Sequence, residues 1–125
     1  MKMKKGVIMM FQKEIELVTK TDFEVVRDEI TEGVVGFPLV TAFSSGTKVT
    51  LTRVKPQGEF SEHRDDYHHV LYFISGNGVG WLEDEEYGIM PGRLVQIPKG
   101  TLHGYRNDSG ETMTLLTINI PENEA

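Results

Sequence analysis

The chain has 125 residues, no cysteine and a formal net charge of −6, so we expect one domain without disulfides or thiolate metal sites. The acidic charge argues against a nucleic-acid surface, which needs clustered Lys and Arg. No apolar run approaches the roughly 20 residues that span a membrane, and none resembles a signal peptide; we therefore expect a cytoplasmic protein that binds neither nucleic acid nor membrane.

The first segment with a structural pattern is residues 21–30. Thr21 or Asp22 can cap a helix that begins there. The β-branched Val25 and Val26 favour a strand instead. The pattern alone leaves the two alternatives open.

From residue 46 onward, short β-rich runs alternate with glycine-containing turns. The runs are residues 48–54, 70–74, 79–83, 86–90, 94–98, 102–106 and 112–120. The run VLYFI (70–74) is continuously apolar, as in a buried strand, and the acidic EDEE (83–86) is typical of a solvated hairpin tip. Short strands at this spacing predict an all-β sandwich or barrel, whose core we place at residues 46–120.

All four histidines of the chain, His63, His68, His69 and His103, lie between residues 63 and 103. On a strand, His63 and Asp65 project from one face because alternate side chains share a face. His69 opens the continuously apolar run and His103 opens a later one, so in an antiparallel barrel these positions can converge. His68 faces the other way by the same parity and is predicted to lie at the surface or in an interface.

Imidazole and carboxylate ligands without sulfur suit Fe, Mn, Ni, Zn or Cu more than Ca or Mg. We expect one such divalent ion per chain, bound by His63, Asp65, His69 and His103. These ligands leave about two open positions on an octahedral ion, which suits a reactive rather than a structural metal. The alternative is the two-histidine, one-carboxylate triad of non-haem iron oxygenases, in which His69 is outside the ligand set or a weak fourth ligand.

Two motifs within residues 58–107 resemble those of the cupin superfamily. The second motif is matched in full, at the family spacing, by Gly92, Pro98, Gly100, His103 and Asn107. The resemblance implies that Pro98 and Gly100 shape the turn that delivers His103 into the barrel, since proline fixes φ and glycine admits a positive φ. It also implies a small single-domain cupin with the family's jelly-roll β-barrel, a double-stranded β-helix.

The first motif departs from the family pattern at two ligand positions. Asp65 stands where the pattern has its second histidine, and His69 stands where it has glutamate. Gly58 lies one residue closer to His63 than in the pattern, and Gly76 follows at the family spacing. The exchange keeps three histidines and one carboxylate, which indicates a live metal site. Any role of the family glutamate beyond ligation does not transfer to His69.

Strand alternation also indicates which side chains face the pocket. Leu71 and Phe73 share the face of His69, and Tyr105 follows the second-motif histidine by two residues. Tyr105 is a candidate for hydrogen-bonding the substrate or acting as a catalytic acid, or it simply packs in the barrel. An inward Arg53 would bind a carboxylate or phosphate in the pocket, whereas an outward one would be a solvated surface residue.

The resemblance to cupins admits dioxygenation, isomerisation, decarboxylation and lyase chemistry, among which the fold does not select. We expect a metal-dependent enzyme that acts on a small organic molecule, with a dioxygenase favoured over an isomerase or lyase. The alternative is a non-catalytic cupin that binds or senses a small ligand. A structural or storage role would not require ligand-type residues.

Residues 1–45 carry no motif. In similar proteins such an N-terminal extension adds strands and often exchanges across a dimer. Dimerisation is one way of covering exposed sheet edges. We therefore expect a homodimer in which this extension is exchanged.

Overall fold

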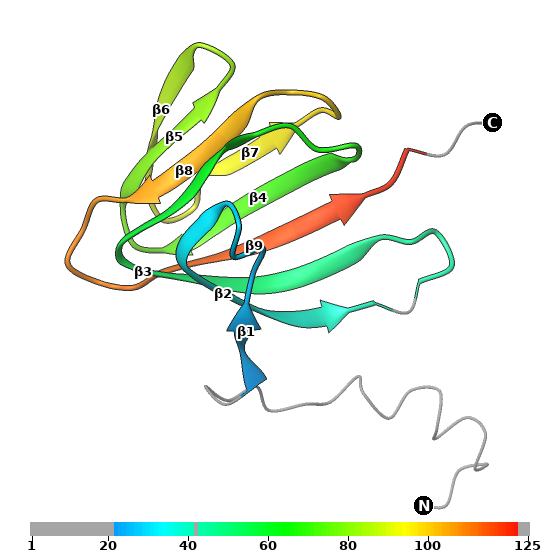
Figure 1. Cartoon of the computed structure of the whole chain (residues 1–125), viewed down its shortest axis with the longest axis horizontal. Coiled ribbons are helices and arrows are strands. Elements are labelled where there is room, and N and C mark those ends of the chain that lie inside the picture. Colours follow the sequence, from blue (N-terminus) through cyan, green and yellow to red (C-terminus); the bar gives the residue numbers. More distant parts are fainter. Residues whose placement is uncertain (1–21, 42, 123–125) are drawn as a thin grey trace, which may run out of the picture.

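The chain folds as one antiparallel sheet that curls on itself (Figure 1). The computed structural model describes residues 22–41 and 43–122. Its strands are β1 (Glu24–Val25), β2 (Thr31–Val40), β3 (Lys48–His63), β4 (His68–Ser75), β5 (Gly78–Leu82), β6 (Glu85–Ile89), β7 (Leu94–Ile97), β8 (His103–Asn107) and β9 (Met113–Ile120). Within these residues, no helix is long and apolar enough to cross a bilayer. The predicted all-β barrel architecture is confirmed.

Strand β3 links the two halves of the sheet. Its first part, residues 48–54, pairs with β2 and β9, and its last part, residues 59–63, pairs with β8. The chain bends in between at Gln57, whose φ is +65°, and at Gly58, where a Cβ would lie 2.8 Å from a backbone carbonyl oxygen. The bend carries the end of β3, and with it His63, alongside β8.

Residues 23–30 form no helix. Glu24 and Val25 form β1, which pairs with β2, and a turn follows at residues 28–29. Strand β2 pairs with β3 of the same chain and places Val34 in the core. Residues 1–21 lie outside the described part, so the exchange of the extension across a dimer stays a prediction.

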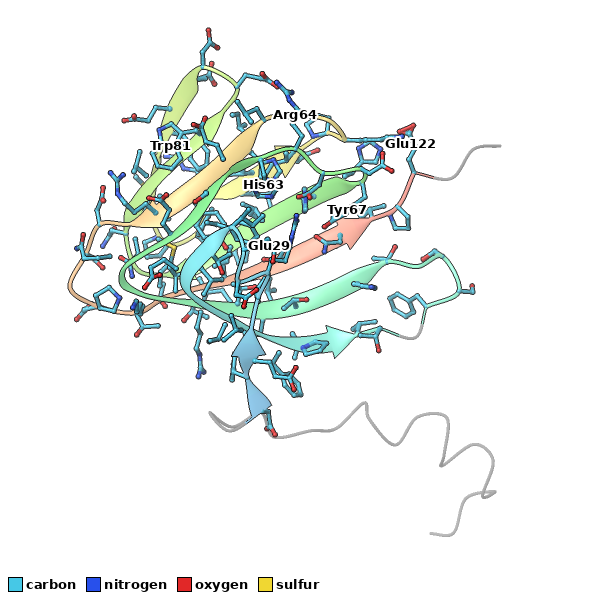
Figure 2. The ribbon with its side chains drawn as sticks, viewed as in Figure 1. Glu29, His63, Arg64, Tyr67, Trp81 and Glu122 are labelled. Atoms are coloured by element: carbon cyan, nitrogen blue, oxygen red, sulfur yellow. The ribbon has the colours of Figure 1, made fainter. Side chains whose placement is uncertain are left out.

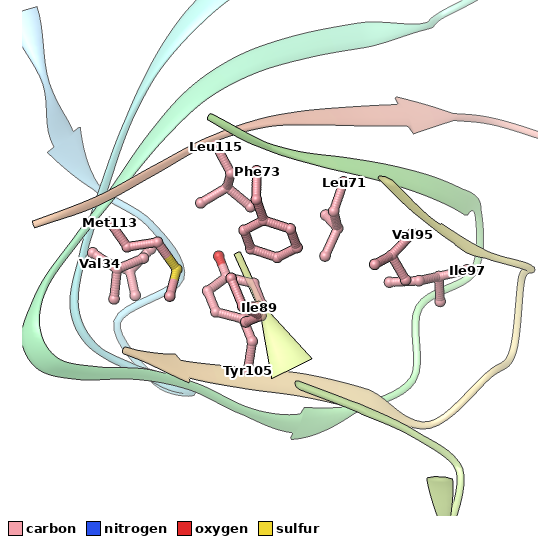
Figure 3. Packing of buried hydrophobic residues seen from close by; sticks show 10 residues of the cluster. Val34, Leu71, Phe73, Ile89, Val95, Ile97, Tyr105, Met113 and Leu115 are labelled. Carbon is pink, nitrogen blue, oxygen red and sulfur yellow. The ribbon is translucent and has the colours of Figure 1, made fainter. Parts of the chain in front are cut away.

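Alternation along β4 and β8 separates a polar end of the barrel from an apolar interior, and Figure 3 shows the side chains of that interior. The inward residues of β4 are His69, Leu71 and Phe73, in that order, and β8 presents His103 before Tyr105. The buried hydrophobic residues are Val34, Val54, Leu71, Phe73, Ile89, Val95, Ile97, Tyr105, Met113 and Leu115. This cluster packs the interior and leaves the histidines at one end of it.

Asn107, the last residue of the second motif, ties the bend in β3 to the turn between β8 and β9. Its fully buried side chain donates from Nδ2 to the carbonyl oxygens of Val54 (3.0 Å), Lys55 (3.1 Å) and Glu111 (2.7 Å). Its Oδ1 accepts a hydrogen bond from the backbone N–H of Ser109 (2.9 Å). One amide therefore satisfies polar groups from both halves of the sheet.

We expect Asn107→Ala to lower the free energy of unfolding by about 3 kcal/mol, because it leaves buried backbone groups without partners at about 1–3 kcal/mol each. Urea denaturation measures the change. The control Asn77→Ala removes an exposed asparagine and should shift stability by no more than about 0.5 kcal/mol. Equal stability of the two variants would contradict this role for Asn107.

Candidate metal centre

The strand register brings the three predicted histidine ligands together. His63, at the end of β3, lies directly opposite His103, at the start of β8. His69, near the start of β4, lies opposite Asn119 of β9. Directly opposed residues of an antiparallel pair project from the same face. The ring centres of His63 and His103 are 4.3 Å apart, and those of His69 and His103 are 4.9 Å apart.

Asp65 joins this cluster from the loop that follows β3. Because β3 ends at His63, the position of Asp65 does not follow from strand alternation, contrary to the prediction. The backbone N–H of Gly100 donates to the Asp65 carbonyl oxygen (3.0 Å), and Arg64, which lies outside the barrel (Figure 2), donates to the Gly100 carbonyl oxygen (2.6 Å). Gly100 has φ +84°, which favours glycine. The turn that precedes His103 therefore also positions Asp65.

The Asp65 carboxylate lies among the three imidazoles. Its Oδ2 is 2.9 Å from Nε2 of His63, 2.7 Å from Nε2 of His69 and 3.6 Å from Nε2 of His103. Donor atoms of His63, Asp65 and His103 lie within 4.8 Å of one another and could hold one metal ion. Two ligands at right angles around an ion at about 2.1 Å are about 3 Å apart. The spacing of the donor atoms therefore fits a shared ion.

The other nitrogen of each ring faces an oxygen acceptor. The contacts are His63 Nδ1 to the carbonyl oxygen of Ser61 (2.7 Å), His103 Nδ1 to that of Thr101 (2.8 Å) and His69 Nδ1 to Oδ1 of Asn119 (2.8 Å). In His63 and His69, Nε2 faces an acceptor as well, Oδ2 of Asp65, so a neutral ring can donate to only one of the two oxygens. A metal ion bound at Nε2 would leave the hydrogen on Nδ1, where an acceptor already lies, so these contacts suit metal-bound imidazoles.

Burial and neighbouring charges set the protonation of the cluster. Burial, together with nearby His63 and His69, lowers the pKa of His103 to about 4, so His103 is neutral at pH 7. Burial also acts to raise the pKa of Asp65. The hydrogen bond from Arg27 and the interactions with His63 and His69 outweigh it, and the pKa of Asp65 lies below its usual value. The cluster therefore combines an ionised carboxylate with a neutral imidazole, the ligand forms that a metal requires.

Arg27 is a site residue that the sequence did not indicate. Its Nη1 donates to Oδ1 of Asp65 at 2.7 Å, from the loop between β1 and β2. Arg27 belongs to a segment without a motif, and 38 positions separate it from Asp65. No periodic pattern could have linked the two residues.

Two aromatic rings flank the ligands and were also missed. The Phe60 ring stacks on His63, with centres 4.7 Å apart, and the Tyr67 ring lies at the same distance from His69. Figure 2 labels His63 and Tyr67, which come from the end of β3 and the loop before β4. The position of Tyr67 inside the first motif was the signal that could have marked it.

A cavity of about 90 Å³ opens beside the ligand cluster. It is lined by Val26, Arg27, Thr50, Thr52, Phe60, His63, Asp65, Tyr67, His69, Leu71, His103, Tyr105, Thr117 and Asn119. Of the predicted pocket residues, Leu71 and Tyr105 lie in this wall, whereas Phe73 is buried in the core with its ring edge toward Tyr105. Pockets for drug-sized ligands measure about 300–1,000 Å³, so this one suits a molecule of few heavy atoms.

Arg53 does not line the cavity, which corrects the expectation of an inward Arg53. The inward residues of this part of β3 are Thr52 and Val54, both buried. Arg53 therefore faces the outer side, with its guanidinium carbon 4.4 Å from the centre of the Phe23 ring. Thr52 is accommodated inside because its hydroxyl is hydrogen-bonded to that of Thr117 (3.0 Å).

Tyr105 and His68 lie outside the ligand cluster. Figure 3 shows the Tyr105 hydroxyl among apolar side chains, and burial beside Tyr87 raises the pKa of Tyr105 well above its usual value. Tyr105 thus keeps its proton, which fits packing rather than acid catalysis. The side chain of His68 is 41 % exposed, and its Nδ1 accepts a hydrogen bond from the Lys99 backbone N–H (2.9 Å).

Residues 50–119 match the family described as the cupin domain. This chain belongs to the cupin family. The match covers more than half of the chain and includes all four residues of the ligand cluster. The expected jelly-roll fold is thereby confirmed together with the family.

Two curated proteins match part of this cupin. It is 28 % identical over 71 residues to quercetin 2,3-dioxygenase of Bacillus subtilis and 31 % identical over 77 residues to the transcriptional activator RhaR of Mannheimia succiniciproducens. The matched parts are 55 % and 62 % of this chain but only 21 % and 26 % of those proteins. The chain thus spans about a quarter or less of these relatives.

Solved structures share the fold. The polyketide cyclase RemF of Streptomyces resistomycificus superposes with a TM-score of 0.73 at 24 % identity, over 89 % of this chain and 82 % of that chain. At this identity the similarity supports the barrel architecture alone.

The buried His103 predicts a pH dependence of stability for the metal-free cupin. The pKa of His103 is about 4 in the folded chain and 6.5 as the ordinary value, so the unfolded chain binds the extra proton first. The stability that neutral His103 contributes is therefore fully present above pH 6.5. The free energy of unfolding falls by at most about 3 kcal/mol as the pH falls toward 4.

Urea denaturation of the metal-free protein between pH 7 and pH 4 measures this loss. We expect His103→Gln to flatten the pH dependence and His68→Gln, which removes an exposed histidine, to retain it. A wild-type profile that His103→Gln leaves unchanged would rule out His103 as its source.

Proposed function

We propose that this cupin is a metal-dependent enzyme that acts on a small organic molecule. The supporting observation is the donor set, in which three imidazole Nε2 atoms surround one oxygen of an ionised carboxylate. His63, Asp65, His69 and His103 would bind one divalent transition metal, Fe, Mn, Ni, Zn or Cu. His69 lies outside the group of three residues whose donor atoms are within 4.8 Å of one another. We include it as a fourth ligand because its Nε2 lies 2.7 Å from the same Oδ2.

When bound, such an ion supplies a Lewis acid or a redox centre beside the substrate. The chain supplies the surroundings: Phe60, Leu71 and the Tyr105 ring form an apolar wall that limits water in the cavity. Burial, together with the charge of Asp65, raises the pKa of Tyr67. Tyr67 therefore keeps its phenolic proton and is available to donate a hydrogen bond to the substrate.

Among the possible reactions we favour dioxygenation over isomerisation or a lyase reaction. The partial match to quercetin 2,3-dioxygenase supports this choice. A polycyclic molecule of the size of quercetin does not fit a cavity of about 90 Å³. We therefore propose a smaller substrate than the name of that relative indicates.

A second candidate function is a binding module that holds a small ligand without turnover. The match to the transcriptional activator RhaR favours it. Such a module needs the same cavity and can use the same ion to hold its ligand. The two functions therefore differ in turnover rather than in the composition of the site.

Metal analysis tests the donor set. Elemental mass spectrometry of the untagged wild type and of His68→Ala, the matched control, should find about one transition-metal ion per chain. The double variant His63→Ala/His103→Ala should hold less than about a tenth of an ion. Equally low occupancy of the wild type, even after anaerobic loading with Fe, Mn, Ni, Zn and Cu, would contradict the proposal. A single His69→Ala variant that retains its metal would reduce the ligand set to the triad.

Turnover separates the two candidate functions. The loaded wild type should consume oxygen with one member of a panel of small acids, enols and diols, and the double variant should not. Saturable ligand binding without product formation would contradict the enzyme and support the binding module.

A further inference from the structure

Arg27 contributes the only Lys or Arg side chain among the described residues that line the cavity. Its Nη1 holds Oδ1 of Asp65 at 2.7 Å, while Oδ2 of the same carboxylate faces the imidazoles. The guanidinium therefore lies next to the ligand cluster without occupying the ligand oxygen. Its side chain is 39 % exposed, so it borders both the cavity and solvent, where an entering molecule would meet it.

The loop that carries Arg27 is held in one conformation. Arg27 has φ +41°, a left-handed region that is uncommon for residues other than glycine and that clusters at functional sites. The N–H of Ile30 donates to the Arg27 carbonyl oxygen (2.9 Å), and the Thr31 hydroxyl bonds to the carbonyl oxygens of Val26 and Arg27. The Ser61 N–H donates to the Ile30 carbonyl oxygen (2.9 Å), which attaches the loop to β3. Several hydrogen bonds therefore hold the loop with Arg27 in this uncommon conformation.

The charges of the site favour an anionic ligand. Asp65 and Arg27 neutralise each other, so a bound divalent ion would leave the cavity positive. A guanidinium has five N–H donors, and its contacts to Asp65 and Glu29 are made through Nη1 and Nε. The planar fork of arginine matches the two oxygens of a carboxylate better than any other side chain does.

We propose that Arg27 binds the carboxylate of the substrate, and that the site selects small monoanionic carboxylic acids over neutral molecules of the same shape. The cavity of about 90 Å³ limits such an acid to few heavy atoms. Asp65 occupies the guanidinium until the acid arrives and competes with it for Arg27. This inference rests on the proposed function in taking the bound acid as the substrate of the metal site and in counting the charge of the bound ion toward the attraction.

Pyruvate and its neutral amide, pyruvamide, are matched probes for the charge preference. Chemical-shift titration of the zinc-loaded full-length chain should give a dissociation constant for pyruvate at least about tenfold below that for pyruvamide. Arg27→Gln should remove the preference. Arg53→Gln, which changes the arginine on the outer side of β3, should retain it. A wild type without the preference, or Arg27→Gln that keeps it, would overturn the proposal.

A metal-free experiment separates this inference from the proposed function. Asp65→Asn frees the guanidinium from its internal carboxylate, so the metal-free variant should bind pyruvate more tightly than the metal-free wild type, by about fivefold or more. Adding Arg27→Gln should abolish the gain. No gain in a folded Asp65→Asn protein would overturn the carboxylate site whatever the metal content. A gain in a protein that never binds metal would retain the carboxylate site and reject the metalloenzyme. The Asp65→Asn measurement tests the carboxylate site even if the single Arg27→Gln variant does not fold.

Discussion

The site depends on three contacts that place an oxygen acceptor at Nδ1 of each imidazole. Two of the acceptors, the carbonyl oxygens of Ser61 and Thr101, are backbone atoms two residues before the histidines they orient. The third is the side chain of Asn119, directly across from His69 in the sheet. Because these acceptors belong to β3, to β9 and to the turn before β8, folding of the barrel already places them where metal-bound imidazoles would carry hydrogen. The donor set is therefore pre-organised before any ion binds.

The rest of the fold supports that arrangement at a distance. The bend in β3 brings His63 beside β8, and Asn107 ties the residues before the bend to the turn between β8 and β9. The turn at Gly100 precedes His103 and also binds the backbone of Asp65. A residue far from the cavity, such as Asn107, thus affects the ligands through backbone position rather than through contact. The loop of Arg27 belongs to the site through a direct contact, the hydrogen bond from Arg27 to Asp65, although its sequence shows no motif.

Local patterns predicted the strands because alternation depends on spacing along one strand. The histidine cluster joins β3, β4 and β8, and it was predicted from the place of each histidine beside an expected strand. The second motif marked the turn at Gly100 correctly, since a positive φ there requires a particular residue. Asp65 was placed beside His63 by strand alternation, which does not apply to it. Asp65 lies in a loop after β3, and a backbone hydrogen bond from Gly100 positions that loop. Alternation did not predict the orientation of Arg53, since the face that it shares with Val49 and Leu51 looks the more apolar of the two. The structure instead buries Thr52 and Val54, and the Thr52 hydroxyl has a partner inside the barrel. The contact of Arg27 with Asp65 is long-range and leaves no periodic signal.

The most direct test of this account is the tautomer of each histidine, read from two-bond ¹H–¹⁵N correlation spectra of the zinc-loaded protein. The account predicts that His63, His69 and His103 all carry hydrogen on Nδ1 and none on Nε2, with the three Nε2 resonances shifted by coordination. His68 should show no such shift and serves as the internal reference. A hydrogen on Nε2 of His63 or His103 would contradict the claim that the barrel directs their lone pairs toward a shared metal ion.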